Sequence, residues 1–532
     1  MLLAPLTALV VALLLVEDQP PSASQQSLAL VARFDAAWTR SDYPTMYAEL
    51  SPRARQHVSL RRFEQDYRHA ADTAGVTAVG FGHARVQGGR VVVPAHATTG
   101  AFATIHERVV LSVSLAHHDR GIEWSPADRF PGLRDGEQLT VRLVARRGAI
   151  LAGDGAQLSP TSSGSYPLGA SGELISGQLD QSPDGLTVGV SGLERVYNQI
   201  LTGTPGEQMW FGKRLIAATR PRRGETVRTT IDPRLQAAAT SALGNRYGAI
   251  AVIRPDSGAV LALAGVALSS AQPPGSTFKI ITTTAALQNG LATPTSTYPV
   301  QTATTIDGYT LHNSDGEACG GTLINAFAIS CDSVFAPLGA QIGAQRLVAA
   351  ADAYGFNHTP RVAGELPSTV PSPASIGNSL AVGSSAIGQG RVLATPLEMA
   401  SVAATIANDG VRARPRLLAS LPVIPQRVTS PTVAGELREL MLAVVSYGTG
   451  TAAAIPGVPI AGKTGTAELG NGPATTSDTK NTDAWFVAFP AVPDPAVAVA
   501  VMLVRDGFGG QAAAPLARQV LLAALRETDH DT

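Results

Sequence analysis

The chain has few cysteines, few aromatic residues and no excess of charge of either sign, and these shortages exclude several classes of protein. Two cysteines among 532 residues are too few for a disulfide-rich scaffold, and neither they nor the 10 histidines show metal-ligand spacing. Acidic and basic residues number 41 and 40, so the formal net charge is −1. A nearly neutral chain lacks the basic footprint of a nucleic-acid-binding protein. We therefore expect neither a metal site nor a nucleic-acid partner.

Long apolar runs are also rare, and the most prominent one stands at the beginning of the chain. Residues 2–16 are apolar apart from Thr7. This run is shorter than the roughly 20 residues that span a bilayer. No lysine or arginine precedes this run, and small residues at 22–24 offer a site for a signal peptidase. We predict that residues 1–25 form a signal peptide or membrane anchor. The protein would then work at the extracytoplasmic face of the cell membrane, or be secreted if the segment is cleaved.

Three regions are predicted after this segment. Residues 26–135 combine helical spacing with later strand-like runs and predict a small α+β domain. Residues 136–224 predict a β-rich linking domain, because short strands alternate there with glycine, serine and proline turns. In residues 225–532, apolar strand-like segments near both ends enclose a mostly helical middle. This arrangement predicts one antiparallel sheet assembled from distant segments.

Lysine is scarce, which makes its few positions informative. The lysines are Lys213, Lys279, Lys463 and Lys480. Lys279 stands three residues after Ser276, and the prolines at 273 and 274 precede an apolar run that predicts a helix. Residues i and i+3 share one helix face, so we expect the Ser276 hydroxyl and the Lys279 amine within hydrogen-bond reach. A partly buried lysine with a lowered pKa can take the proton of a serine nucleophile.

Two later segments distinguish this Ser-x-x-Lys pattern from a chance match. Ser477-Asp478-Thr479-Lys480 has the same spacing, but it lies in a polar stretch with no apolar helix after it. Ser276 is followed instead by Ser330-Cys331-Asp332, at the end of an apolar helical run, and by Lys463-Thr464-Gly465-Thr466 beside a predicted strand. We therefore predict that the chemistry lies at Ser276.

The three patterns in this order resemble the signature of penicillin-recognising acyl-serine enzymes. Residues 225–530 resemble more specifically the transpeptidase domain of class B penicillin-binding proteins. The segments that carry this likeness are 229–236, 388–390, 395–397, 448–452 and 483–486. The linking region is more weakly similar to that family's linking or dimerisation domain, at 147–148 and 191–194. The first region resembles the nuclear-transport-factor-like N-terminal domain of a subset of the family.

The resemblance implies a multidomain α+β and α/β protein that ends in a penicillin-binding transpeptidase fold. That fold is an antiparallel five-stranded sheet flanked by helices, with a helical subdomain. It also implies a reaction. Ser276 attacks the carbonyl of the penultimate D-alanine of a peptidoglycan stem peptide and expels the terminal D-alanine. An amine of a neighbouring stem then takes the acyl group, and β-lactam antibiotics, which mimic the donor, acylate the same serine.

The resemblance also implies a role for each motif residue. Lys279 is the base for Ser276, and Ser330 relays a proton to the leaving amine. Lys463, with Thr464, Gly465 and Thr466, binds the terminal carboxylate of the substrate. The backbone amides of Ser276 and Thr466 form the oxyanion hole, in which one donor is typically worth about 3 kcal/mol.

Asp332 departs from the pattern, since most of these enzymes have asparagine at that position. An asparagine amide can donate to a substrate carbonyl, whereas an ionised aspartate only accepts. The carboxylate would also favour the charged form of Lys279 and make it a poorer base. Asp332 either pairs with a lysine in an active enzyme, marks reduced turnover, or is a neutral replacement. In an exported protein Cys331 can bridge to Cys319, and the alternative is two buried thiols.

The prediction is a class B-like peptidoglycan D,D-transpeptidase with no metal or organic cofactor. A serine β-lactamase or β-lactam sensor would share the motifs. However, no Glu-x-x-x-Asn element follows Asp332, and no effector region of a sensor is present. The second alternative is a non-catalytic scaffold of the cell-wall machinery, which only Asp332 favours. No glycan-polymerising region is recognisable, so we expect a membrane partner to supply the glycan strands.

Overall fold

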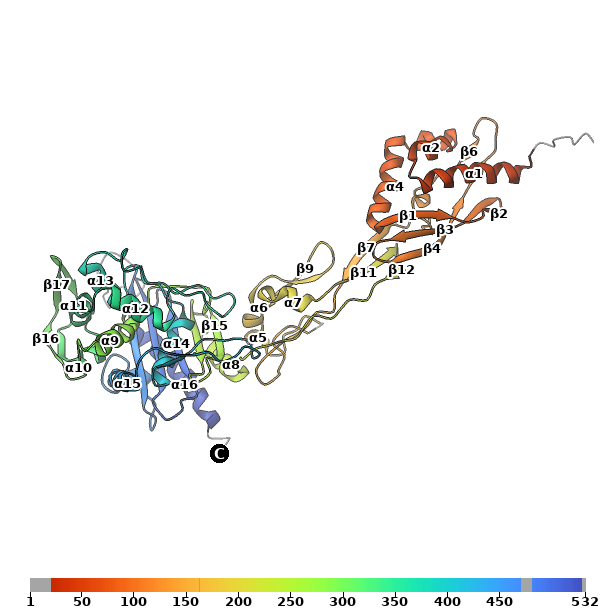
Figure 1. Ribbon diagram of the computed structural model, residues 1–532. Helices are drawn as coiled ribbons and strands as arrows, with labels where there is room; N and C mark the ends of the chain where they lie inside the picture. Colours follow the sequence, from red (N-terminus) through yellow and green to blue (C-terminus); the bar gives the residue numbers. More distant parts are fainter. Residues whose placement is uncertain (1–20, 162, 470–480, 529–532) are drawn as a thin grey trace, which may run out of the picture. The chain divides into compact units, whose positions relative to one another are not determined.

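The computed structural model describes residues 21–161, 163–469 and 481–528 (Figure 1). These residues form two compact units. The N-terminal unit comprises residues up to 146 together with 181–186 and 203–223, and the C-terminal unit comprises 147–180, 187–202 and the residues from 224 onward. None of the described helices has the length and apolar composition of a bilayer-spanning segment. Residues 1–20 of the predicted signal or anchor segment lie outside the described ranges, and Ser22 already caps helix α1 (Ala23–Thr39).

The N-terminal unit packs helices against an antiparallel sheet. Its first elements are α1, α2 (Tyr43–Ala48), α3 (Pro52–His57), α4 (Leu60–Ala74), β1 (Val76–Phe81), β2 (Arg85–Gln87), β3 (Arg90–Thr99), β4 (Ala103–Leu111), β5 (Val113–Ser114) and β6 (Gly121–Ile122). The sheet order is β1-β3-β2, with β4 also paired to β3. Polar side chains cap all four helices at their N-termini. Phe34, Trp38, Phe63 and Tyr67 form an aromatic core between helices and sheet, as expected for an α+β unit.

The linking region differs from its prediction as a separate domain, because its segments divide between the two units. Strands β7 (Leu139–Val144), β11 (Gly206–Phe211) and β12 (Arg214–Ala218) form a three-stranded sheet. Met209 and Phe211 of this sheet pack against Ile105 and Phe130 of the N-terminal unit. The rest of the region packs on the C-terminal core through Ile150 and other apolar residues. Short strands and turns cannot enclose a core of their own, so each segment buries its apolar side chains against a neighbour.

The linking segments of the C-terminal unit are held by an ion pair between the partly buried Arg147 and the buried Glu194. They include β8 (Ile150–Leu151), α5 (Gly169–Ser176), β10 (Thr187–Gly189), α6 (Gly192–Val196), α7 (Asn198–Thr202) and β13 (Val227–Arg228). Arg147 Nε donates to Glu194 Oε2 at 2.9 Å, and its Nη1 donates to Asn198 and Thr202. The 147–148 and 191–194 segments, which carry the weaker likeness, therefore meet in one network.

The C-terminal unit is built on a five-stranded antiparallel sheet in the order β15-β14-β24-β23-β22. Its strands are β14 (Gly248–Ile253), β15 (Val260–Gly265), β22 (Ile460–Glu468), β23 (Thr482–Pro490) and β24 (Ala498–Leu503). The prediction of one antiparallel sheet made from distant segments is confirmed, because β24 joins the first strand pair to the last one. Lys463 lies in β22, which is an edge strand.

Helices cover both faces of this sheet (Figure 1). On one face lie α8 (Pro233–Leu243) and α16 (Ala514–Thr528), and on the other lie α14 (Pro396–Ala407) and α15 (Pro431–Ser446). Within β14, Ala249 and Ala251 belong to the core on the side of α14 and α15. Ile250 and Val252 belong to the core on the side of α8 and α16. Both faces of the strand are therefore buried, which explains its continuous apolar sequence.

A mainly helical region follows β15 and carries two of the three motifs. It contains α9 (Lys279–Gln288), α10 (Leu323–Ala328), α11 (Asp332–Ile342), α12 (Ala344–Tyr354) and α13 (Ser379–Ala386). Two small strand pairs accompany these helices. They are β16 (Thr297–Gln301) with β19 (Cys319–Thr322), and β17 (Ala303–Ile306) with β18 (Tyr309–His312).

Candidate active site

Ser276 lies in a single 3₁₀ turn, η2 (Gly275–Phe278), and Lys279 is the first residue of α9. The predicted helix therefore starts later than expected, with Ser276 in the turn that leads into it. This turn packs closely on β22: a Cβ on Gly275, whose φ is +52°, would come within 2.7 Å of the Thr466 carbonyl oxygen. A Cβ on Gly465 would likewise lie 2.7 Å from the Pro274 carbonyl oxygen. The two glycines let the Ser-x-x-Lys and Lys-Thr-Gly segments meet backbone to backbone.

Ser330 lies between α10 and α11 in a left-handed conformation with φ +66°, which is uncommon for a residue with a side chain. Lys279 Nζ donates to the Ser330 carbonyl oxygen at 2.7 Å and to Ser330 Oγ at 3.2 Å. Lys463 Nζ donates to the same Oγ at 2.8 Å. The Ser330 hydroxyl thus joins the lysines of the other two motifs.

Both lysines are completely buried, at 0% exposed. Burial lowers the pKa of Lys279, although Asp332 opposes this effect through its charge and a hydrogen bond. Burial lowers the pKa of Lys463 further, and the neighbouring charge of Lys279 adds to the depression. The rings of Phe335 and Phe327 lie below the two amines, at 5.3 and 5.5 Å from Nζ to ring centroid. The environment therefore makes a proton easier to remove from each amine than from an exposed lysine, the direction that a base or proton relay requires.

Asp332 forms an ion pair with Lys279, with 2.7 Å between Oδ1 and Nζ. This contact is the lysine pairing that the sequence left as one of three possibilities. The carboxylate raises the pKa of Lys279, but burial outweighs it, so the net direction is downward. Asp332 therefore partly offsets the effect of burial on the pKa of Lys279, without restoring the pKa of an exposed lysine.

Ser276 opens onto a cavity of about 410 Å³ in front of these lysines. The wall consists of Ser276, Asn313, Ser314, Glu317, Cys319, Ile329, Ser330, Thr449, Thr451, Ala452, Thr464, Thr466, Phe508, Gly510 and Gln511. All three predicted motifs contribute to this wall or lie directly behind it. Within the described residues no hydrogen bond joins the Ser276 hydroxyl to Lys279, whose Nζ is engaged with Ser330 and Asp332.

The threonines of β22 have partners outside the predicted motifs. Thr464 Oγ1 lies 2.5 Å from Thr449 Oγ1, and Thr466 Oγ1 accepts from the Gly509 amide at 3.5 Å. The prediction gave Thr449 no role, although it stands in the 448–452 segment that carried the family likeness. Phe508 and Gln511 were also missed, because nothing in the local pattern around them differs from an ordinary loop.

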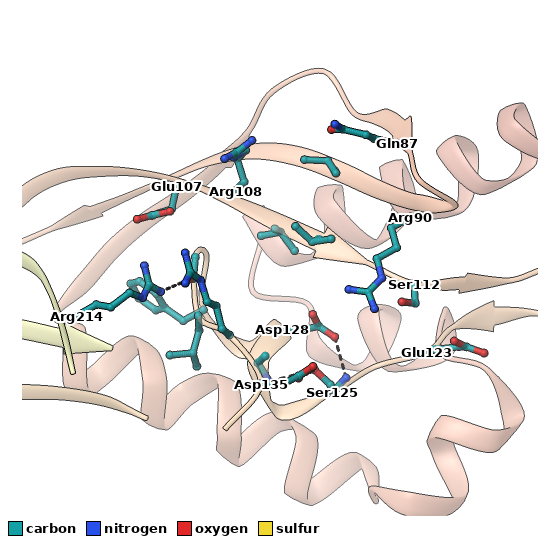
Figure 2. A pocket seen from close by; sticks show the side chains of 18 residues that line it. Gln87, Arg90, Glu107, Arg108, Ser112, Glu123, Ser125, Asp128, Asp135 and Arg214 are labelled. Atoms are coloured by element: carbon teal, nitrogen blue, oxygen red, sulfur yellow. Dashed lines mark hydrogen bonds between the residues drawn. The ribbon is translucent and has the colours of Figure 1, made fainter. Parts of the chain in front are cut away.

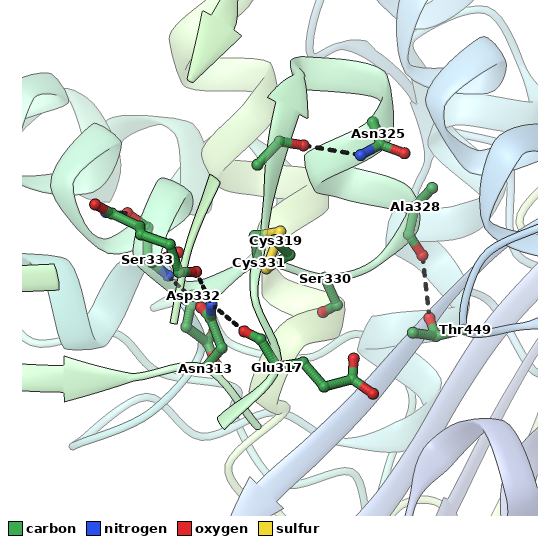
Figure 3. Close-up of a disulfide and its surroundings, with 12 residues drawn as sticks. Asn313, Glu317, Cys319, Asn325, Ala328, Ser330, Cys331, Asp332, Ser333 and Thr449 are labelled. Atoms are coloured by element: carbon green, nitrogen blue, oxygen red, sulfur yellow. Dashed lines mark hydrogen bonds between the residues drawn. A yellow bond between two sulfur atoms is a disulfide. The ribbon is translucent and has the colours of Figure 1, made fainter. Parts of the chain in front are cut away.

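The structure contains a disulfide between Cys319 and Cys331, with 5.8 Å between the Cα atoms (Figure 3). Cys331 stands between Ser330 and Asp332, and Cys319 lines the cavity. Asn313 supports the same segment, because its Oδ1 accepts from the Ser333 amide at 2.8 Å. No pattern in the sequence marks this asparagine, and its role follows from its burial and its hydrogen bonds in the structure.

A second cavity of similar size, about 450 Å³, lies in the N-terminal unit (Figure 2). Its wall combines arginines, such as Arg90 and Arg214, with carboxyl groups, such as Asp128. No serine of this wall is hydrogen-bonded to a lysine or histidine among the described residues. In the same ranges, no three histidine, cysteine, aspartate or glutamate side chains are grouped as metal ligands. The competing match at 477–480 lies outside the described residues.

Comparison with known proteins assigns the family. Residues 248–522 match the family model of the penicillin-binding protein transpeptidase domain. The peptidoglycan D,D-transpeptidase PbpA of Mycolicibacterium smegmatis is 38% identical over 407 residues, which cover 63% of this chain and 80% of that protein. The chain belongs to the class B penicillin-binding proteins. This transpeptidase is also similar to PbpA of Mycobacterium tuberculosis, at 36% identity over 63% of this chain and 79% of the relative.

Solved structures agree with this assignment. The ceftriaxone acyl-enzyme complex of penicillin-binding protein A from M. tuberculosis has a TM-score of 0.61 and 31% sequence identity to this transpeptidase. The match covers 72% of this chain and 98% of that one. The D,D-transpeptidase domain of a peptidoglycan glycosyltransferase from Eggerthella lenta gives the same TM-score and identity. The predicted transpeptidase fold, with helices flanking the sheet, is therefore confirmed for the C-terminal unit.

Proposed function

We propose that this protein crosslinks peptidoglycan stem peptides through an acyl-enzyme at Ser276. The single observation that supports this most strongly is the Ser330 hydroxyl, which contacts two fully buried lysines behind the cavity that Ser276 lines. Burying two amines in one place is costly in folding free energy, and strongly perturbed amines of this kind are typical of sites that carry out acid–base catalysis. Stem peptides ending in D-alanyl-D-alanine and β-lactams are the ligands that fit this chemistry.

The first half of the reaction forms the ester. Neutral Lys279 takes the Ser276 proton, and Ser276 Oγ bonds to the carbonyl carbon of the penultimate D-alanine. The amides of Ser276 and Thr466 stabilise the resulting oxyanion. The C–N bond then breaks, and the terminal D-alanine leaves with a proton relayed from Lys279 through Ser330.

Substrate binding and the second half use the other motif. Lys463, with Thr464 and Thr466 on the edge strand, holds the terminal carboxylate of the donor. Gly465 between them allows the close contact with the Ser276 turn. An acceptor amine later attacks the ester carbon, loses a proton to the same relay and releases Ser276 with its proton restored.

The setting of the protein is proposed on similar grounds. Crosslinking takes place outside the cytoplasmic membrane, which suits an N-terminal anchor or signal segment at residues 1–25. A membrane partner would polymerise the glycan strands. The helices and the antiparallel sheet of the N-terminal unit are compatible with a nuclear-transport-factor-like domain at 26–135, which we propose as its fold.

Intact mass spectrometry after incubation with penicillin G tests the proposal, with Ser276→Ala as the control. We expect one stable adduct on the parent and none on the variant. Rapid drug hydrolysis without an adduct would indicate the β-lactamase alternative. A stable adduct without crosslinking of stem peptides in a reconstituted system would indicate the non-catalytic scaffold. The absence of both adduct and hydrolysis on a folded parent would contradict acylation at Ser276.

A further inference from the structure

Glu317 is the one charged side chain among the described residues that line the catalytic cavity. The rest of the wall is hydroxyl, amide, apolar or backbone, and Lys279 and Lys463 are buried behind it. The Glu317 side chain is exposed, and its carboxylate makes no hydrogen bond or ion pair within the described ranges. An unpaired carboxylate therefore faces the space in which the substrates must react.

The backbone of Glu317 is held in place by a buried asparagine. Asn313 is 4% exposed, and its Nδ2 donates to the Glu317 carbonyl oxygen and to the Gln301 carbonyl oxygen, both at 2.8 Å. Its Oδ1 accepts from the Ser333 amide. One side chain thus ties Glu317 to the segment that carries Ser330 and Asp332, and each tie is a hydrogen bond that a buried amide must make.

A covalent link supports the same segment from the other side. Cys319, two residues after Glu317, is bonded to Cys331, which stands between Ser330 and Asp332 (Figure 3). An ordinary solvated glutamate on a loop needs no such support. The disulfide and Asn313 together fix where the Glu317 backbone stands relative to the Ser330 hydroxyl.

We propose that Glu317 recognises a primary ammonium group on a stem peptide in the catalytic cavity. The proposal rests on the proposed crosslinking reaction. The donor brings a terminal carboxylate, which we place at Lys463. The unpaired carboxylate of Glu317 would repel that group, so Glu317 suits a cation instead. The cationic groups in the reaction are side-chain amines of diamino acids, and such an amine is present on the acceptor stem and can be present on the donor stem. A carboxylate on the cavity wall attracts the ammonium group of either stem while that group is still hydrated.

Whether Glu317 binds an ammonium group on the donor stem is tested with two penicillins that differ by one amino group. Benzylpenicillin lacks a charge on its side chain, and ampicillin carries an ammonium there. We expect Glu317→Gln to slow acylation by ampicillin about threefold, the size of a partly exposed ion pair, and to leave benzylpenicillin within about 1.5-fold. High salt should weaken the ampicillin preference of the parent and leave the variant unchanged.

Whether Glu317 binds an ammonium group on the acceptor stem is tested with a donor that carries no amine and an acceptor stem with a free diamino-acid side chain. If Glu317 binds the acceptor, Glu317→Gln should raise the acceptor KM about threefold, while kcat and hydrolysis of the donor stay constant. Glu439→Gln, an exposed glutamate on α15 away from the cavity, is the matched control and should change nothing.

The two arms give distinct outcomes. A selective effect in either arm supports the proposal and identifies the stem that carries the ammonium. No selective effect in both arms overturns it, and so does an equal loss for benzylpenicillin and ampicillin, which would make Glu317 a residue that only positions the loop. Benzylpenicillin acylation of the parent reports separately on Ser276, so a failure of the crosslinking proposal is distinguishable from a failure of the role of Glu317.

Discussion

Two cavities lined by described residues, one in each unit, are similar in volume and opposite in how they place charge. The cavity of the N-terminal unit has about 450 Å³ and the catalytic cavity about 410 Å³. Charged residues are abundant on the wall of the first. They are Arg90, Glu107, Arg108, Glu123, Asp128, Arg134, Asp135 and Arg214. The catalytic wall carries Glu317 alone among the described residues, with its two lysines behind the surface.

This difference shows that cavity size and charge content do not mark the catalytic site. In the N-terminal cavity, Arg90, Arg108 and Arg134 are exposed to solvent. Solvated guanidinium groups keep their charge and carry out no proton transfer at neutral pH. In the catalytic unit, burial lowers the pKa of both lysines, and Ser330 links them. The feature that marks the catalytic site is therefore a pair of buried lysines behind a cavity wall lined with hydroxyl groups.

The largest effect that would test this comparison comes from Lys279→Met. The substitution keeps an apolar stem in the buried site and removes the base, so we expect acylation by penicillin G to fall about 1,000-fold, as for a lost general base. Lys213→Met removes an exposed lysine from the N-terminal unit and serves as the control. Stopped-flow acylation rates measure both. Loss of less than tenfold in Lys279→Met would assign the proton to another group.

Asp332→Asn should have a smaller effect, and its direction follows from the charges. Asp332 raises the pKa of Lys279, so removal of the carboxylate lowers that pKa and increases the neutral amine at a given pH. We expect the acid limb of the acylation profile to move to lower pH. Acylation at mildly acidic pH should rise roughly tenfold, the worth of one charge-assisted hydrogen bond. If the acylation rates of parent and variant coincide from pH 5 to 9, the Asp332 carboxylate has no effect on acylation.

Loss of the disulfide should affect stability more than chemistry. Replacement of Cys319 and Cys331 together by serine opens a short loop, for which we expect a loss of about 2–4 kcal/mol in the unfolding free energy of the C-terminal unit. Acylation should fall only about two- to threefold, because Asn313 still holds the Ser333 amide with one hydrogen bond. Guanidinium unfolding followed separately for the two units gives the measurement. A matching loss in the N-terminal unit would contradict the assignment.

Much of the C-terminal unit could be predicted from sequence, because its signals are local. Apolar runs gave the strands, and the prolines before Ser276 gave the start of α9 within a few residues. A local pattern shows neither the left-handed conformation of Ser330 nor its contacts with Lys279 and Lys463, which come from distant segments. Thr449 and Asn313 were missed for the same reason, since their partners lie 15 and 20 positions away.

The linking region was predicted less well. Residues 136–224 contain strands and turns, as expected, but no pattern within them shows which core receives their apolar side chains. Met209 and Phe211 join the N-terminal core, whereas Ile150 and Leu201 join the C-terminal one. Membership of a domain is a property of tertiary contacts, which composition does not reveal. The likeness at 147–148 and 191–194 was the only hint that part of the region belongs with the catalytic unit.

The smallest expected effect on acylation comes from Asp128→Asn in the N-terminal cavity, and it sharpens the comparison through pH. Burial raises the pKa of Asp128 to about 7, whereas an unfolded aspartate ionises near about 4. Between these values the folded state holds a proton that the unfolded state has lost, so stability falls as pH rises through this window. Asparagine can still accept the Ser125 amide hydrogen bond, which the parent makes at 2.8 Å, and it has no proton to lose.

Asp128→Asn should therefore flatten the decrease in N-terminal unit stability between about pH 4 and 7, and leave a remaining slope from Asp35, whose pKa burial also raises to about 7. The exposed Asp72→Asn is the matched control and should keep the parent slope. Thermal unfolding across this pH range measures the effect, with penicillin acylation recorded on the same samples. Acylation that changes more than about twofold would mean that the N-terminal cavity communicates with Ser276, and the contrast between a structural carboxyl group and catalytic lysines would no longer hold.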